Sequence, residues 1–141
     1  MSRRHLFDTS EGLVVKSLRG VIASNPALSL IEAQKVVFDS ARRQTDVAVI
    51  SGGGAGHEPA WAGFVGKNML SAAVSGDIFA SPSTKQILTG IEAVPSEKGT
   101  VLVVLNYTGD CLNFGLACEK VNAAHGRPCV CESICVEVKP L

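Results

Sequence analysis

The chain has 141 residues, of which 46% are hydrophobic and 18% charged, a composition that excludes a disordered polar chain and suits a folded domain. Its 13 basic and 13 acidic residues give a formal net charge of zero, so no basic field attracts nucleic acid or an anionic membrane surface. The apolar runs are far shorter than the ~20 residues of a membrane helix. No signal-type apolar segment follows the basic N-terminus, and a cytoplasmic protein is expected.

The expected elements alternate between helices and short strands. Helices are predicted over residues 12–25, 83–94 and 112–125, and a short helix or turn over 59–65. Strands are predicted over residues 46–50, 70–74, 100–105 and 130–138, with a further short strand within 31–39. Because the strongest strands are apolar throughout, we predict an α/β fold with a mostly parallel sheet and helices on both faces.

Residues 51–59, Ser-Gly-Gly-Gly-Ala-Gly-His-Glu-Pro, follow the strand predicted over 46–50 and are expected to form a loop. Four glycines in five residues cost conformational entropy on folding, which is tolerated where the backbone approaches another group closely or takes a positive φ. The N–H groups of such a loop can bind an oxygen-rich ligand beside His57 and Glu58. The alternative is a tight turn with an incidental histidine.

This glycine-rich segment does not match the common nucleotide or nucleophile motifs. A P-loop requires Lys and Ser or Thr after the glycines, where His57 and Glu58 stand. In the Gly-x-Gly-x-x-Gly pattern, the third glycine would fall on His57 or on Pro59. No Gly-x-Ser-x-Gly sequence is present. The segment therefore predicts a ligand site of another kind.

Residues 106–110, Asn-Tyr-Thr-Gly-Asp, follow the strand predicted over 100–105. Ligands of parallel α/β sheets bind beyond the carboxyl ends of the strands, so Asp110 is expected near the glycine-rich segment. The alternative is that Asp110 only caps the helix expected from residue 112. Both interpretations stay open on the residues alone.

Five cysteines lie in the C-terminal third of the chain, namely Cys111, Cys118, Cys129, Cys131 and Cys135. An odd number without a secretion signal favours free thiols. The spacing of the last three is not that of a Cys-x2-Cys knuckle, and on a strand they would share one face. No metal site is therefore expected.

Three segments occur in order: SGGGAGHEPAWAGFVGKNML, SGDIFASPSTKQI and NYTGDCLNFGLA. With them the chain, up to about residue 125, resembles the N-terminal part of the substrate-binding domain of the dihydroxyacetone (glycerone) kinase family. The resemblance implies one domain, 1–141, shorter than the family domain, with residues 127–141 as an atypical tail.

The resemblance also implies roles for four residues. Gly53 and Gly54 would pack against a ketose and hydrogen-bond its hydroxyl. His57 would contact a substrate hydroxyl and assist its deprotonation, and Asp110 would act as the general base toward the attacking hydroxyl. The implied ligand is dihydroxyacetone or a similar small hydroxyketone. The family phosphorylates it with ATP and magnesium held on a domain absent here, or with phosphate from a partner protein.

The chain departs from the family pattern in ways that bear on activity. Leu105 stands where the family usually has a lysine, and Ala55 where serine is common. The family's histidine that bonds to the substrate carbonyl has no counterpart among these residues. We therefore expect the chain to bind no cofactor, to be inactive alone, and to form a homo-oligomer or pair with a partner subunit. The alternative is a non-catalytic module that binds small polyols or regulates another protein.

Overall fold

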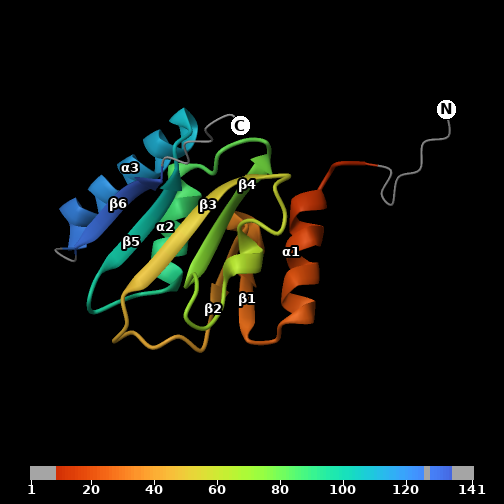
Figure 1. Cartoon of the computed structure of the whole chain (residues 1–141). Coiled ribbons are helices and arrows are strands. Elements are labelled where there is room, and N and C mark those ends of the chain that lie inside the picture. The colour runs from red at the N-terminus through yellow and green to blue at the C-terminus, as the bar shows by residue number, and fades with distance from the viewer. Residues whose placement is uncertain (1–8, 126–127, 135–141) are drawn as a thin grey trace, which may run out of the picture.

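Six strands form one mixed sheet in the computed structural model, which describes residues 9–125 and 128–134 (Figure 1). The strands lie in the spatial order β1-β2-β4-β3-β5-β6. Their bounds are Leu28–Ile31 (β1), Val36–Asp39 (β2), Ala48–Ala55 (β3), Ala72–Ile78 (β4), Thr100–Leu105 (β5) and Cys129–Ile134 (β6). Strand β6 begins within the predicted tail, and residues 135–138 of its predicted extent lie outside the described residues.

Three of the five strand pairings are parallel, namely β3 with β4, β3 with β5, and β5 with β6. This confirms a parallel sheet for the four strands that alternate with α2 and α3. The hairpin of β1 and β2 adds two antiparallel pairings. The sequence did not predict β1, because its four residues contain no alternation long enough to distinguish a strand from a loop.

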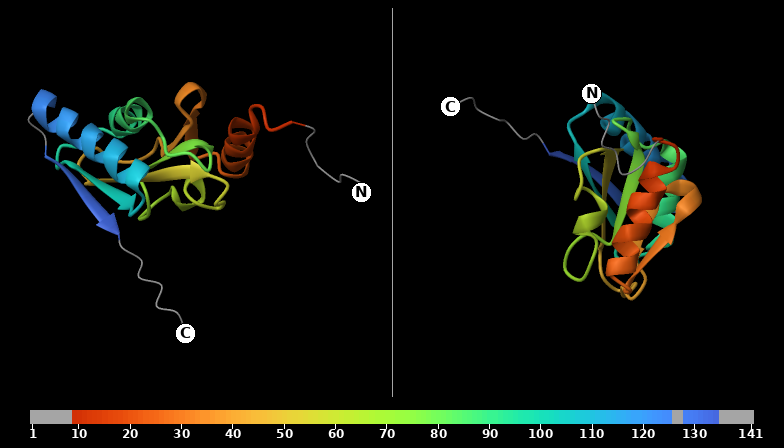
Figure 2. Two further views of the ribbon diagram at one scale, coloured as in Figure 1. Left: turned by 90° about the horizontal axis from the view of Figure 1, so that it is seen from above. Right: turned by 90° about the vertical axis from the view of Figure 1, so that its right-hand side faces the viewer.

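Helices cover both faces of the sheet, as predicted. Helices α2 (Thr84–Ala93) and α3 (Thr108–His125) pack side by side over one face, and α1 (Leu13–Ser24) packs on the other (Figures 1 and 2). Neighbouring strand residues point to opposite faces, so Val36 joins the core under α2 and α3 while Val37 joins the core under α1.

The N-terminus of α2 is fixed by a capping box at Ser83. The hydroxyl of Ser83 accepts a hydrogen bond from the backbone N–H of Gln86 at 3.4 Å. The side-chain oxygen of Gln86 accepts one from the N–H of Ser83 at 2.9 Å. Two N–H groups that the helix leaves unpaired are satisfied in this way, and the start of α2 is set beside the end of β4.

One face of the outer strands is only partly covered. Leu102 and Val104 of β5 are buried in the core under α2 and α3. The alternate residues of β5, Val101 and Val103, are half-buried on the opposite face, and Val130, which pairs with Val101 from β6, is 46% exposed. This face of β5 and β6 has no helix over it in the described part of the chain.

None of the helices within residues 9–125 and 128–134 has the length and apolar character needed to cross a bilayer.

Candidate functional site

The carboxyl ends of β3, β4 and β5 meet at one edge of the sheet, which we call the rim. Gly52 of β3 lies opposite Val74 of β4 and Val104 of β5, both in parallel register. The segments that follow these strands, residues 56–59, 79–83 and 106–110, therefore leave the sheet at the same edge. The predicted placement of the glycine-rich segment and of Asp110 at a common edge agrees with this topology.

The glycine run itself is a strand, which corrects the prediction of a loop from Ser51 onward. Strand β3 continues through Gly52, Gly53 and Gly54 to Ala55, and the loop begins only at Gly56, whose φ is 101°. Glycine is disfavoured in strands, so the run suggested a loop. Strand β4 likewise continues to Ile78, although its glycine and aspartate predicted an end near residue 75.

Close packing explains why β3 contains glycine. A Cβ on Gly52 would lie 2.3 Å from the carbonyl oxygen of Val74, and one on Gly53 would lie 2.7 Å from Nε1 of Trp61. Both distances are shorter than a non-bonded contact allows, so a residue with a Cβ does not fit at either position without displacing its neighbours. The indole of Trp61 packs against the backbone at Gly53, and its Nε1 is buried without a hydrogen-bond partner among the described residues.

Residues 79–82, which we call the bridging segment, connect the two predicted loops. A Cβ on Gly54 would lie 2.9 Å from the backbone nitrogen of Ala80, and one on Gly109 would lie 2.7 Å from the hydroxyl of Ser81. The amide of Asn113 donates to the carbonyl of Pro82 at 2.9 Å. The bridging segment thus touches the end of β3 on one side and the start of α3 on the other.

His57 lies exposed at the rim, directly after β3. Its ring meets the ring of Phe79 edge to face, with centroids 5.5 Å apart and planes at 68°. The contact joins the glycine-rich segment to the first residue of the bridging segment.

Asp110 is buried at the opposite side of the bridging segment, with 4% of its surface exposed. Helix α3 begins at Thr108, four residues earlier than predicted, so Asp110 stands in its first turn. The alternative that Asp110 caps a helix starting near residue 112 is therefore wrong. A carboxylate is favoured at this end of a helix. Its Oδ1 is buried and accepts no hydrogen bond from the described residues.

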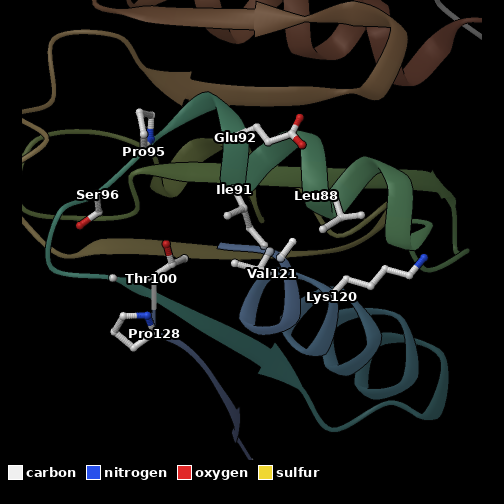
Figure 3. Close-up of a pocket in the computed structure, with 11 residues that line it drawn as sticks. Leu88, Ile91, Glu92, Pro95, Ser96, Thr100, Lys120, Val121 and Pro128 are labelled. Carbon is white, nitrogen blue, oxygen red and sulfur yellow. The ribbon is translucent and has the colours of Figure 1, made fainter. Parts of the chain in front are cut away.

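His57 and Asp110 share the rim, but neither lines any of three hollows found among the described residues. A hollow of about 430 Å³ beside α1 is lined by Gly56, Glu58 and Ile78. A second, of about 390 Å³, lies between α2 and α3 at the other end of the strands, next to Thr100 at the start of β5 (Figure 3). A third, of about 1010 Å³, lies near Met69. Over the residues that the structure describes, none of these three is lined by His57 or Asp110.

The rim residues do not fit a magnesium–nucleotide complex. In residues 9–125 and 128–134, no three His, Cys, Asp or Glu side chains are placed to hold a metal ion together. Lys35, which the antiparallel β2 brings to the rim, donates to Asp77 at 2.5 Å. The backbone at Gly53 and Gly54 is packed against Trp61 and Ala80, so it forms no open cradle for phosphates.

Three of the described cysteines, Cys118, Cys129 and Cys131, lie between α3 and β6, whereas Cys111 follows Asp110 in the first turn of α3. Among the described residues, Cys111, Cys118, Cys129 and Cys131 form no disulfide bond, and Cys135 falls outside the described residues. Cys129 and Cys131 pack on the same face of β6, as predicted. The thiol of Cys118 donates to the carbonyl of Cys129 at 2.9 Å. Burial, together with the neighbouring Cys118, raises the pKa of Cys129 to about 12, so this thiol stays protonated and unreactive at neutral pH.

Comparison with known proteins assigns a family. The Dak1 domain model matches residues 19–137. A dihydroxyacetone kinase of Komagataella pastoris is 53% identical over 124 residues, which cover 87% of this chain and 20% of that protein. The triokinase/FMN cyclase of Mus musculus is 46% identical over 127 residues, covering 87% of this chain and 22% of that protein. The chain thus spans about a fifth of the length of these relatives.

Two kinds of solved structure share the fold. The crystal structure of the dihydroxyacetone kinase from C. freundii in complex with AMP-PNP and Mg2+ has a TM-score of 0.87 and 44% identity, over 94% of this chain and 26% of that one. The dihydroxyacetone kinase operon co-activator DhaQ has a TM-score of 0.80 and 34% identity, over 84% of this chain and 36% of that one. The family resemblance seen in the sequence is confirmed, and the chain belongs to the Dak1-domain family of the dihydroxyacetone kinases.

Proposed function

We propose that the rim is part of a binding site for dihydroxyacetone or a similar small hydroxyketone. In this proposal the backbone of Gly53 and Gly54, which Trp61 and Ala80 cover here, offers groups to the ligand once these residues move aside, and His57 contacts one hydroxyl. Asp110 accepts the proton of the hydroxyl that attacks phosphorus in the kinases of the family. The parallel register that brings the ends of β3 and β5 to one edge supports this arrangement.

The observation that carries the proposal is the buried Oδ1 of Asp110, which has no hydrogen-bond partner among the residues that the structure describes. A buried acceptor without a donor is unfavourable, and a hydroxyl that reaches it restores the missing hydrogen bond. Such a carboxylate can also remove the proton of that hydroxyl. Because Asp110 is buried, ligand entry requires the side chains around the bridging segment to move.

Asp110→Asn is expected to weaken dihydroxyacetone binding about tenfold or more, since hydrogen bonds to a charged group are worth about 1.5–3 kcal/mol. Isothermal titration calorimetry at millimolar ligand measures the effect. Asp77→Asn is the matched control, because it removes the same charge at the same rim from a side chain that is 75% exposed. Its Kd is expected to stay within about twofold of the wild type.

Two results would contradict the proposal. One is the absence of any binding heat for the wild-type chain at millimolar dihydroxyacetone. The other is an equal loss of affinity in Asp110→Asn and Asp77→Asn, which would indicate a general effect of charge at the rim.

A second candidate function is supported by one of the similar structures. DhaQ is described as an operon co-activator, so a protein of this fold acts as a regulator. A chain of this kind would bind a small polyol without turnover and transmit the binding to a partner. Ligand binding with a change of oligomeric state, and without phosphorylation, would favour this function over a kinase subunit.

We propose that a second copy or a partner subunit covers the half-buried face of β5 and β6. Size-exclusion chromatography of the chain alone is expected to give a dimer or larger species. Val130→Lys is expected to shift it toward the monomer, because a charge at this position opposes burial of the face. Leu116→Lys is the matched control, since Leu116 is equally exposed at 46% but lies on α3, which packs over the opposite face of the sheet. A stable, soluble wild-type monomer would contradict this prediction.

A further inference from the structure

Phe79 is an exposed aromatic residue with an ordered ring contact. Its side chain is 74% exposed, so burial of apolar surface does not explain its position. The ring nevertheless meets the imidazole of His57 edge to face at 5.5 Å. A Cβ on Gly56 would lie 2.8 Å from Cε1 of Phe79, so the ring occupies the space that the glycine leaves open. The dipeptide Gly56-His57 therefore surrounds one edge of the Phe79 ring.

The backbone of Phe79 is held in a conformation that a bulky residue rarely adopts. Its φ is 54°, in the left-handed region. The N–H of Phe79 donates to the carbonyl of Ala55 at 2.9 Å, and the next N–H, that of Ala80, donates to the backbone carbonyl of Asp77 at 3.1 Å. Conformations of this kind persist where the surrounding structure holds them, and they are frequent at functional sites. Here the two hydrogen bonds direct the phenyl ring toward His57.

We propose that Phe79 is a positioning residue for His57. An exposed histidine side chain exchanges between staggered rotamers within nanoseconds. Edge-to-face contact with a ring that is itself fixed favours one of these rotamers by roughly threefold to tenfold. The selected rotamer keeps the imidazole at the rim, where a ligand hydroxyl is bound. The positioning concerns the free chain, whereas its effect on the ligand rests on the function proposed above.

The test compares Phe79→Gly with Phe79→Tyr in the 141-residue chain. Glycine adopts a φ of 54° without strain and removes the ring, whereas tyrosine keeps the ring. In nuclear magnetic resonance spectra at one fixed pH, the imidazole C–H protons of His57 are expected to show a ring-current shift and couplings of one dominant χ1 rotamer. His57→Gln assigns these signals. Both features are expected to disappear in Phe79→Gly and to remain in Phe79→Tyr.

Thermal unfolding separates positioning from a purely structural role. Phe79→Gly is expected to unfold at the same or a higher temperature than the wild type, because it relieves backbone strain and loses little buried surface. A structural role would instead lower the unfolding temperature of Phe79→Gly. Unchanged His57 resonances in a folded Phe79→Gly chain would overturn the proposal.

The ligand measurement distinguishes this inference from the proposed function. Phe79→Gly is expected to weaken dihydroxyacetone binding about threefold to tenfold, and Phe79→Tyr to leave it unchanged. If the wild-type chain binds no ketose, the proposed function fails, and the resonances of His57 still decide whether Phe79 positions the ring. If ketose binds equally to wild type and Phe79→Gly, the positioning has no role in binding and that part of the inference is wrong.

Discussion

Gly76→Ala is expected to destabilise the chain by about 3 kcal/mol or more, the largest effect we predict for a single methyl group. A Cβ on Gly76 would lie 1.9 Å from the carbonyl oxygen of Ala80 and 2.9 Å from the backbone nitrogen of Pro82. Both are backbone atoms, so no rotamer change relieves the overlap. The bridging segment would have to move off β4. Urea denaturation measures the change in the free energy of unfolding.

Gly20→Ala is the matched control for this prediction. Gly20 lies in the exposed part of α1, and no atom lies within 4 Å of its Cβ position. Alanine is expected to stabilise the chain there by about 0.5–1 kcal/mol, because it is the better helix former. The two substitutions add the same methyl group with opposite expected signs. A Gly76→Ala chain as stable as the wild type would show that the bridging segment does not pack on β4 as described.

The elements with strong local signals could be predicted from the sequence. Strand β5 matches its predicted bounds, since a continuous apolar run between turn residues defines it. Helix α2 was predicted within one residue at each end, because its apolar residues recur at helical spacing. Alternation of such strands and helices was enough to predict parallel pairing and therefore the common edge of the glycine-rich segment and Asp110.

The extents of β3 and β4 could not be predicted, because their glycines are required by close contacts with segments that are distant in the sequence. Gly52 is required by the carbonyl of Val74, and Gly76 by the return of the bridging segment. No local pattern distinguishes such a glycine from one in a turn. The burial of Asp110 and the contact of His57 with Phe79 were missed for the same reason. The only sequence signal for Phe79 was its place in the family segment SGDIFASPSTKQI.

The purified chain is expected to show no phosphorylation of dihydroxyacetone by ATP and magnesium above the background of a His57→Ala variant. The residues of this chain supply too few of the groups that phosphoryl transfer requires. The rim has one buried carboxylate and no set of ligands for a metal ion in the described part of the chain. Leu105, at the end of β5, gives the rim an aliphatic side chain and no charge.

Phosphoryl transfer depends on positioning and charge neutralisation, and positioning alone can account for about 7–11 kcal/mol of the barrier. The measurement is a coupled spectrophotometric assay with a full-length dihydroxyacetone kinase as the positive control. The control enzyme is expected to phosphorylate dihydroxyacetone at least about 10⁴-fold faster than this chain. Calorimetry on the same preparation shows whether ketose is bound. Binding without turnover would agree with a rim that orients the hydroxyl but lacks the phosphoryl donor site. A rate for the wild type clearly above that of His57→Ala would contradict this prediction, because it would mean that the rim with His57 and Asp110 also binds the phosphoryl donor.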